Sequence, residues 1–553
     1  MPNFLEAIFG QLQRAADRVV LREVHGEKFV SVTGRELLER VQRVRGYLRG
    51  AGMQPGDRCA LLGANSIAWI ACNLALMAEK AIVVPLYSRQ AATDLVGMLQ
   101  DCGPSLLLTG DESLATAVAN LWTDAPPRVL FEVAIRGNSS THALDTPPLP
   151  REDPDLVTII YTSGTSGEPK GVCLTTANLT HMIGCTTERL EQLMAGRREP
   201  DRIFHYLPMN FAASWIVMLS ALTRETEFTL STDLTKLADE IQMAAPNYFL
   251  NVPTLLERVR RGVEENIAKQ TAPIRSLYTR AKEAWQRQNS GRKRTFDPIW
   301  LSLANLLIFG KIKARFGSHL LALICGSAPL APETQQFFLM LGVPVLQGYG
   351  LTETTGICTL DDPLISVEPG HVGQAVPGIE MRIGDNEEIL VRGPNIFAGY
   401  WNRPEETAKV MRDGWFHTGD QGEVTVGGNW RIIGRIKNLI ILNSGHNIPP
   451  EPIEDRVLQL LPGAQQVVLV GNGKGYLCAL VTGDVGDDAV RSALDAVNPE
   501  LPHYRQIRNF VVLREAFTAE NGLLTANGKL RRDAINARFA AEIDAMYGRK
   551  ANA

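Results

Sequence analysis

The sequence predicts an α/β protein in which a large domain is followed by a small one. At 553 residues the chain exceeds one typical hydrophobic core, so at least two domains are expected. Short apolar runs bounded by Gly, Pro and Asp alternate with helical patterns through most of the chain before residue 350. A new α/β pattern begins after Gly434, and the remaining residues, on the order of a hundred, are enough for a domain that folds alone.

The apolar runs of the large domain suit buried strands of a sheet that is covered on both faces. We predict such strands at residues 59–63, 81–86, 105–109, 157–161 and 320–325. Between residues 380 and 435 the pattern changes to short alternating strands with Gly-rich turns, as in 387–392 and 422–430. The large domain is therefore expected to combine α/β structure with a β-rich subdomain.

We place the domain boundary between residues 435 and 436, so that the domains comprise residues 1–435 and 436–553. In the small domain, residues 451–461 have a helical pattern, and residues 466–470 and 476–482 are predicted strands. This mixture predicts an α+β C-terminal domain.

Composition and charge limit the class of function. The net charge of −4 lacks the excess of Lys and Arg that nucleic-acid binding requires, so nucleic acid is not expected as a partner. The eight cysteines form no CxxC pair, which favours reduced core thiols over zinc ligands or disulfides. The N-terminal residues have no secretory pattern, and the longest apolar segment, 299–309, is too short to span a bilayer. We expect a cytoplasmic protein.

A loop rich in small and hydroxyl residues follows the predicted strand 157–161. Its sequence is Thr162-Ser-Gly-Thr-Ser-Gly-Glu-Pro-Lys-Gly171. Two glycines allow a tight turn that exposes N–H groups, four hydroxyls add donors and Lys170 adds a cation, which together match the many acceptors of a polyphosphate. The spacing is not that of the P-loop, and a flexible linker is the alternative. A linker is disfavoured because the loop lies between two apolar segments.

The segment 161–171 resembles the phosphate-loop motif of the acyl-adenylate-forming superfamily, which includes acyl-CoA synthetases, luciferases and adenylation domains. Other motifs of that family follow in order, at 326–329, 347–354, 415–420, 434–438 and 524–532. The resemblance implies a large N-terminal adenylate-forming domain, with two α/β subdomains and a β-rich one, and a small mobile C-terminal domain. It also implies an AMP-forming acid–thiol ligase.

The resemblance assigns a nucleotide site and its catalytic groups. Tyr349 offers a face for adenine, Asp420 has two oxygens for the ribose hydroxyls, and Glu353 is the expected Mg²⁺ ligand. The catalytic residues implied are Lys529, Glu353 and Thr165. Lys529 is included because a lysine from a mobile domain can neutralise charge that develops on the α-phosphate. The full nucleotide site comprises Thr162, Ser163, Gly164, Thr165, Ser166, Gly167, Lys170, Gly326, Ser327, Ala328, Gly348, Tyr349, Gly350, Thr352, Asp420 and Arg435.

In this superfamily the small domain rotates between two half-reactions, and Lys437 occupies the position of the pivot. ATP and Mg²⁺ are the cofactors implied for the first half-reaction. Coenzyme A is the co-substrate implied for the second, and a phosphopantetheine group on a separate acyl carrier protein is the alternative acceptor.

The acid substrate is predicted from the segment 207–215, which resembles the wall of the acyl pocket. Phe211, Ala212 and Trp215 are its candidate residues. Amino-acid-activating relatives place an aspartate where this chain has Ala212, and a buried substrate ammonium would have no partner there. Residues 303–317 resemble an insertion of long-chain acyl-CoA synthetases, so a fatty acid is favoured. An aryl acid remains an alternative substrate, and a plain core position remains an alternative for Trp215.

One segment has a charge opposite to that of the whole chain. Residues 255–315 contain 14 Lys and Arg against 5 Asp and Glu, a net charge of +9. Within it, cations at 292–294 and 311–315 flank the apolar run 299–309, as in helices that rest on anionic membranes. We expect residues 292–315 to contact the inner face of a membrane peripherally. Solvated charges around a partly buried helix are the alternative.

Overall fold

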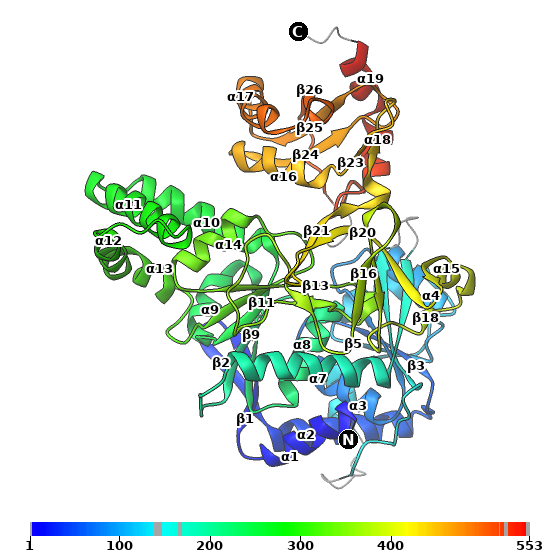
Figure 1. The fold of residues 1–553 in the computed structure, drawn as a ribbon. Helices are drawn as coiled ribbons and strands as arrows, with labels where there is room; N and C mark the ends of the chain where they lie inside the picture. The colour runs from blue at the N-terminus through cyan, green and yellow to red at the C-terminus, as the bar shows by residue number, and fades with distance from the viewer. Residues whose placement is uncertain (1–2, 138–145, 164–168, 519, 525–528, 549–553) are drawn as a thin grey trace. The chain divides into compact units, whose positions relative to one another are not determined.

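The computed structural model describes residues 3–137, 146–163, 169–518, 520–524 and 529–548 (Figure 1). It contains two compact units. The larger unit comprises Met1–Met381, Val391–Phe416 and Thr425–Trp430, and the smaller unit comprises Arg382–Leu390, His417–Val424 and Arg431–Ala553.

The larger unit contains a seven-stranded sheet. Its strands are β3 (Arg58–Leu62), β4 (Ile82–Leu86), β5 (Leu106–Thr109), β6 (Arg128–Leu130), β7 (Leu156–Ser163), β8 (Pro169–Thr175) and β18 (Gly399–Tyr400), in the order β18-β8-β7-β4-β3-β5-β6. From β7 to β6 all neighbours are parallel, whereas β8 is antiparallel to both β7 and β18. The apolar runs of β3, β4 and β5 are buried almost throughout, as parallel strands covered on both faces require.

A nine-stranded sheet forms the second layer of strands in the larger unit. Its strands are β1 (Val19–His25), β2 (Lys28–Thr33), β9 (Asp201–His205), β10 (Thr226–Leu230), β11 (Tyr248–Asn251), β12 (Ala322–Cys325), β13 (Val345–Tyr349), β14 (Thr359–Leu360) and β15 (Gln374–Ala375). The order is β15-β14-β13-β12-β11-β9-β10-β1-β2. Strands β9, β11, β12 and β13 are parallel neighbours, so their carboxyl ends share one edge.

Helices cover these sheets. They are α1 (Phe4–Arg14), α2 (Gly34–Gly50), α3 (Ile67–Ala78), α4 (Ala92–Cys102), α5 (Glu112–Leu121), α6 (Phe131–Arg136), α7 (Thr176–Leu193), α8 (Ala212–Leu222), α9 (Leu237–Ala244), α14 (Pro332–Met340) and α15 (Pro404–Val410). Helices α3 and α8 are buried on nearly every side, which explains why both are apolar all round. The predicted strands 59–63, 81–86, 105–109, 157–161 and 320–325 are present as β3, β4, β5, β7 and β12. The predicted α/β class is confirmed.

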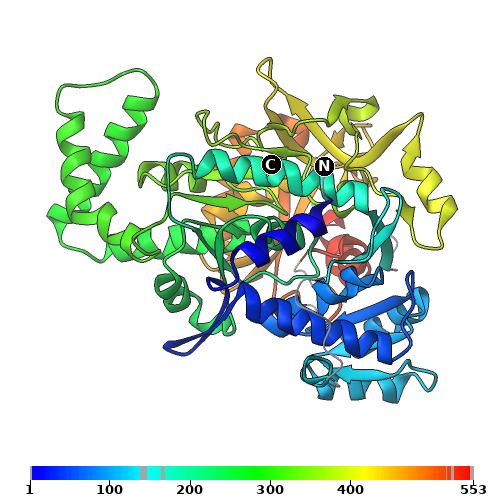
Figure 2. The ribbon, with the colours of Figure 1, turned by 90° about the horizontal axis from the view of Figure 1, so that it is seen from below.

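Four helical segments project from one side of the larger unit. They are α10 (Pro253–Ala268), α11 (Ala272–Asn289), α12 (Asp297–Ala304) and α13 (Gly310–Ala314), with a π-helix at Asn305–Phe309 between the last two. Figure 2 shows α10 to α13 standing away from the sheets. In the part of the chain that the structure describes, no helix is both long enough and apolar enough to cross a bilayer.

The β-rich segment comprises β16 (Glu380–Ile383), β17 (Glu388–Arg392), β19 (Met411–Arg412), β20 (Trp415–Val424) and β21 (Trp430–Arg435), in the order β16-β17-β20-β19 with β21 beside β20. A short ribbon of β22 (Ile440–Ile441) and β23 (Asn447–Ile448) follows.

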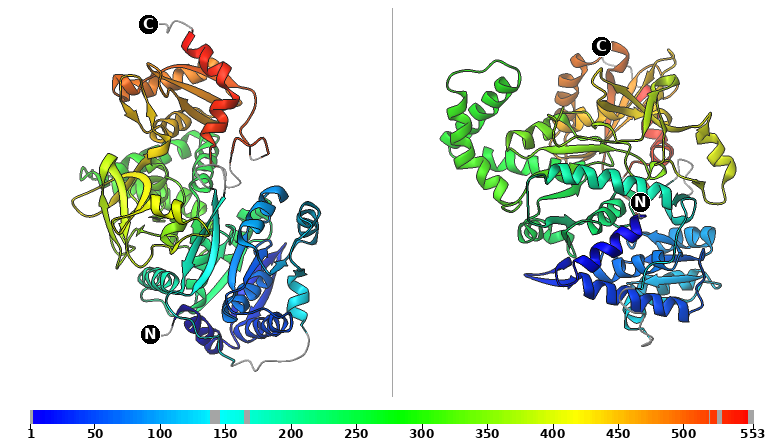
Figure 3. Two further views of the ribbon diagram at one scale, coloured as in Figure 1. Left: turned by 90° about the vertical axis from the view of Figure 1, so that its right-hand side faces the viewer. Right: turned by 60° about the horizontal axis from the view of Figure 1, so that its bottom comes forward.

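The end of the smaller unit is a three-layer structure. Its sheet joins β24 (Ala464–Val470), β25 (Leu477–Gly483) and β26 (Ile507–Leu513). Alternate residues of β24 point to opposite faces: Val467 and Leu469 belong to a core with α16 (Glu451–Leu460) and α17 (Asp487–Val497), and Val468 and Val470 to a core with α18 (Arg532–Arg538) and α19 (Ala540–Gly548). Figure 3 shows the sheet and its red C-terminal helices.

Candidate active site

The predicted phosphate loop joins two paired strands. In the β7–β8 hairpin, Thr162 lies opposite Lys170 and Ser163 opposite Pro169. Gly171 has no room for a side chain, since an added Cβ would lie 2.6 Å from Ile159 Cγ2. The predicted residues Gly164, Thr165, Ser166 and Gly167 lie outside the described part of the chain. Thr162 and Lys170 are thus held at adjacent positions on the two strands that lead into and out of the loop.

Lys170 has an anionic and an aromatic neighbour. Its Nζ lies 2.6 Å from Glu406 Oε2, on α15, and 5.2 Å from the centre of the Tyr400 ring. Only 15% of the Lys170 side chain is exposed, and Lys170 together with Lys409 lowers the pKa of Glu406 to about 2. The lysine therefore keeps a fixed position beside the loop.

The other predicted phosphate and adenine motifs leave adjacent strand ends. Gly326, Ser327 and Ala328 follow β12, and Gly348 and Tyr349 end β13, its parallel neighbour. A Cβ on Gly326 would lie 3.1 Å from the Gly348 carbonyl oxygen, so the two motifs touch. Ser327 has a φ of +75°, a strained value for a residue with a side chain. Ligands of open α/β sheets bind at such carboxyl edges.

Gly350 and Thr352 belong to the motif 347–354 and lead to Glu353, which lies in the 3₁₀ turn Thr352–Thr354. A Cβ on Gly350 would lie 2.5 Å from the Gly356 carbonyl oxygen, so the turn closes tightly on itself. All of these positions are partly exposed: Gly348, Tyr349, Gly350, Thr352 and Glu353.

Tyr400 connects the two halves of the predicted phosphate site. Its hydroxyl donates to Glu353 Oε1 at 2.8 Å, and the Glu353 carbonyl accepts from Phe397 N at 2.9 Å. Because β18 pairs with β8, placing Tyr400 opposite Val172, the same ring lies beside Lys170. Tyr400 was not predicted, and the sequence signals of its strand contain nothing that shows this pairing.

A buried network supports the strand that carries Tyr349. Gln347 N donates to Asp361 Oδ2 at 2.8 Å, and the Gln347 amide donates to Gln335 Oε1 at 2.9 Å. Burial raises the pKa of Asp361 to about 7, although the bond from Gln347 opposes this shift. These side chains hold the end of β13 in place.

The predicted acyl-pocket segment contacts the chain just after the motif 347–354. Phe211 precedes α8 and Ala212 begins it, and a Cβ on Gly356 would lie 3.3 Å from Ala213 N. Trp215 is fully buried, and its indole N–H donates to Asn73 Oδ1 at 3.2 Å. Trp215 therefore packs between α8 and α3, and its role in acyl binding stays a prediction.

In the smaller unit, Asp420 and Arg435 form an ion pair. Arg435 Nε, at the end of β21, lies 2.9 Å from Asp420 Oδ1 on β20, and only 5% of the Asp420 side chain is exposed. Asp420 N also donates to Thr418 Oγ1 at 3.1 Å. The structure thus brings together the two residues predicted as ribose contacts.

Lys437 and Lys529 also lie in the smaller unit, and both are exposed. Lys437 lies in the turn Ile436–Asn438, where surrounding protein and Arg435 lower the pKa of its ammonium group. Lys529 precedes Leu530, which pairs with Leu524 across residues 525–528. Three residues further on, Arg532 forms ion pairs with Glu454, one of which has an Nη1–Oε1 distance of 2.8 Å. This partly buried contact holds the chain in place three residues after Lys529.

Glu353 fits the predicted role of a Mg²⁺ ligand. Within the described residues no cluster of three or more His, Cys, Asp or Glu side chains could hold a metal by itself. Mg²⁺ that accompanies a nucleotide usually takes only one or two protein carboxylates and completes its shell with phosphate oxygens and water. A carboxylate oriented by Tyr400 meets that requirement.

Comparison with known proteins identifies the family. The family model described as AMP-binding enzyme matches residues 8–401, and the one described as AMP-binding enzyme C-terminal domain matches residues 437–551. The chain belongs to the AMP-binding enzyme family. It is an AMP-forming acid–thiol ligase, as the motifs predicted.

Similar proteins cover nearly the whole chain. Long-chain-fatty-acid–CoA ligase FadD15 of Mycobacterium bovis is 29% identical over 99% of this chain and 97% of its own. Long chain acyl-CoA synthetase 1 of Arabidopsis thaliana is 29% identical over 94% of this chain and 88% of its own. The ATP-bound structure of MatB from Rhodopseudomonas palustris is 23% identical, with a TM-score of 0.73 over 97% of this chain and 99% of its own, which shows the shared fold.

Proposed function

We propose that this enzyme converts a fatty acid into its CoA thioester in two half-reactions. In the first, a carboxylate oxygen of the acid attacks the α-phosphorus of ATP and pyrophosphate leaves. In the second, the thiol of coenzyme A attacks the acyl carbonyl and AMP leaves. Atoms balance in both steps, and ATP, the acid and coenzyme A are the only substrates.

The observation that carries this proposal is the position of Glu353. This carboxylate lies beside the carboxyl edge of β12 and β13, it is bonded to Tyr400, and Tyr400 contacts Lys170 of the phosphate hairpin. A polyphosphate needs a cation and oriented donors, and a phosphate-bound Mg²⁺ needs a hard oxygen ligand. Mg²⁺, when bound, would neutralise phosphate charge at this position. Lys170 would contact one part of the triphosphate, and Glu353 would hold the Mg²⁺ ion that accompanies another part.

Several features support a fatty acid as the substrate. Gly356, three residues after Glu353, contacts the start of α8, so an acid bound along Phe211 and Ala212 would have its carboxylate close to the nucleotide. Ala212 offers no carboxylate to an amino-acid ammonium group, which disfavours amino acids. The relatives named long-chain-fatty-acid–CoA ligase and long chain acyl-CoA synthetase are similar over 97% and 88% of their own lengths. An aryl acid would be the next candidate.

For the catalytic residues, we propose that Lys529 neutralises charge on the α-phosphate during the first half-reaction. Asp420 would accept hydrogen bonds from the ribose hydroxyls, and Arg435 would hold that carboxylate in place. Thr162, Thr165 and the backbone of the phosphate loop would bind the phosphates. The domains 1–435 and 436–553 would rotate about Lys437 between the half-reactions, so that the small domain serves each step with a different face.

The test is a substrate screen with two readouts. Pyrophosphate release is measured with saturated fatty acids of graded length and with benzoate-type acids, and thioester formation is measured with coenzyme A or with a phosphopantetheinylated acyl carrier protein. We expect AMP, pyrophosphate and acyl-CoA in equal amounts with aliphatic acids. Turnover of benzoate-type acids alone would contradict the substrate proposal, and acylation of the carrier without any acyl-CoA would contradict the acceptor proposal.

A further inference from the structure

Helix α12 and the π-helix that follows it expose an apolar surface. Five large apolar side chains on this surface have high exposed fractions, namely Phe296 (67%), Ile299 (52%), Leu303 (40%), Leu306 (74%) and Leu307 (43%). The opposite side of the same segment is buried, with Ala304, Ile308 and Phe309 in the core of the helical projection. A helix that is apolar on both sides but buried on only one has a second apolar face to be covered.

The π-helix Asn305–Phe309 accounts for the width of this face. A π-turn contains one residue more than an α-turn, and here Leu306 and Leu307 are exposed while Ile308 and Phe309 point inward. The exposed apolar side chains therefore extend from Phe296, just before α12, to Leu307 in the π-helix.

Cations lie at both ends of the apolar face. Arg292, Lys293 and Arg294 precede α12, and Lys311 and Arg315 follow the π-helix, all of them exposed. Within the part of the chain that the structure describes, none of these five side chains has an ion-pair partner. Two inward contacts, by contrast, are satisfied: Arg287 Nη2 lies 2.7 Å from Asp297 Oδ1, and Arg280 lies over the Trp300 ring. The outward cations are thus available to an anionic partner.

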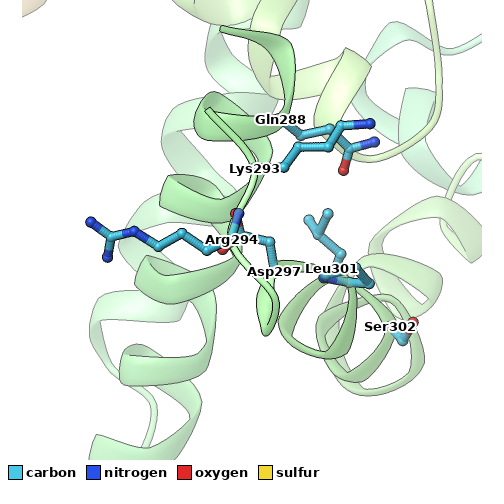
Figure 4. Close-up of a pocket in the computed structure, with 7 residues that line it drawn as sticks. Gln288, Lys293, Arg294, Asp297, Leu301 and Ser302 are labelled. Atoms are coloured by element: carbon cyan, nitrogen blue, oxygen red, sulfur yellow. The ribbon is translucent and has the colours of Figure 1, made fainter. Parts of the chain in front are cut away.

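A cavity of about 330 Å³ opens at the cationic end of the face. It is lined by Gln288, Lys293, Arg294, Asp297, Pro298, Leu301 and Ser302. Figure 4 shows Lys293 next to Gln288 at one end, Leu301 and Ser302 across from them, and the Arg294 guanidinium pointing outward. The Asp297 carboxylate also lines the cavity, but Arg287 already pairs with it. The remaining polar groups, an ammonium, an amide and a hydroxyl beside apolar side chains, suit a phosphate group that is attached to a hydrocarbon chain.

We propose that the surface from Arg292 to Arg315 docks on a membrane that contains anionic phospholipids. Phe296, Ile299, Leu303, Leu306 and Leu307 would enter the acyl boundary, and the cavity at Lys293 would take a lipid headgroup phosphate. The charge of residues 255–315, +9 in a chain of −4, matches a negative surface. The purpose of this contact rests on the proposed function, since a fatty acid is poorly soluble and collects in membranes.

The experiment is vesicle cosedimentation of the full chain at low and high salt, without ATP, acid or coenzyme A. Vesicles contain phosphatidylcholine and phosphatidylglycerol at a ratio of about three to one, or phosphatidylcholine alone. We expect binding to the anionic vesicles only, and we expect it to weaken as salt rises. Lys293→Gln should lower the partition coefficient about fivefold, and Phe296→Ser combined with Leu306→Ser should lower it at least tenfold.

Matched controls are Arg198→Gln, which removes an exposed cation elsewhere, and Leu364→Ser, which removes a leucine that is 68% exposed. Both should bind like the original protein. Equal binding to neutral vesicles, or unchanged binding of the double serine variant, would overturn the proposal. Release by inorganic phosphate alone would identify a free-phosphate site instead. Loss of a dimer in the double variant, with vesicle binding unchanged, would identify a self-association surface.

Vesicle binding and catalysis fail independently in this design. Acyl-CoA formation from a short, water-soluble fatty acid reports on the proposed function without a membrane. If that reaction proceeds while no variant changes vesicle binding, only the membrane proposal is wrong.

Discussion

The hydroxyl of Tyr400 donates a 2.8 Å hydrogen bond to Oε1 of Glu353, while the ring of the same tyrosine lies 5.2 Å from Nζ of Lys170. Glu353 follows a strand of the nine-stranded sheet, and Lys170 belongs to the seven-stranded sheet. One side chain therefore sets the spacing between a cation and a carboxylate that come from different sheets.

Replacing Tyr400 with Phe should slow adenylate formation about tenfold or more. The ring would remain beside Lys170, but Glu353 would lose a hydrogen bond to a charged acceptor, which contributes about 1.5–3 kcal/mol. ATP–pyrophosphate exchange measures the effect. Tyr248→Phe is the matched control, because Tyr248 also donates a 2.8 Å hydrogen bond to a carboxylate, that of Asp201. Tyr248 begins β11, so this bond lies at the end of the strand away from the carboxyl edge. Equal losses in both variants would contradict a specific role of Tyr400.

Lys529→Ala should reduce pyrophosphate exchange by about 10²- to 10³-fold, the scale of one lost electrostatic contact in the transition state. Thioester formation from synthetic acyl-AMP should change little, because in that step the thiol attacks the acyl carbonyl and no carboxylate attacks the α-phosphorus. Lys474→Ala serves as the control, since Lys474 is a lysine of the same unit that is paired with exposed Asp544. Unchanged exchange in the Lys529 variant would remove this residue from the catalytic groups.

The Asp420–Arg435 ion pair should contribute to both stability and nucleotide binding. Arg435→Gln would remove the charge that faces Asp420 Oδ1, a nearly buried carboxylate oxygen, at a cost of about 1–3 kcal/mol after allowance for the partly exposed arginine. Urea denaturation measures this cost, and the KM for ATP should rise. Arg431→Gln is the control on the same strand, because its pair with Glu423 is more than half exposed. A cost no larger than that of the control would show that the pair contributes little.

Trp215→Ala should lower the free energy of unfolding by about 3–5 kcal/mol, because the side chain is fully buried and its indole is bonded to Asn73. Trp122→Ala, at a partly exposed tryptophan, should cost less. Denaturation and a chain-length profile are measured together. A changed chain-length preference with nearly unchanged stability would instead indicate a tryptophan at the mouth of the acyl pocket.

Stability should fall as the pH drops from about 6.5 toward 4. Burial lowers the pKa of His205 to about 4, so between these values the unfolded chain binds a proton that the folded chain does not. His205 therefore lowers the free energy of unfolding only below about pH 6.5, and the loss between pH 6.5 and 4 is about 3 kcal/mol. His205→Leu should flatten this part of the pH profile of the unfolding midpoint. His503→Gln, at an exposed histidine, should leave the profile unchanged.

The sequence predicted those features that depend on local pattern. Apolar runs located β3, β4, β5, β7 and β12, and local motifs located the residues that follow β12 and end β13. Tyr400 could not be predicted because its role depends on β18 pairing with β8, a contact between segments far apart in the chain. The burial of Trp215 depends in the same way on the packing of α8 against α3. The site roles and the boundary at residue 435 stay predictions.

The extra residue of the π-helix has a consequence for how this surface can change. Because the π-turn holds one residue more than an α-turn, deletion of Leu306 or Leu307 would restore a regular α-helix and leave the flanking segments in register. Lys311 would keep its position beyond the apolar face, and Phe316 would stay in the core. A single deletion in this segment can therefore narrow the apolar face without disturbing the core, so the length of the segment, and not only its side chains, can tune its affinity.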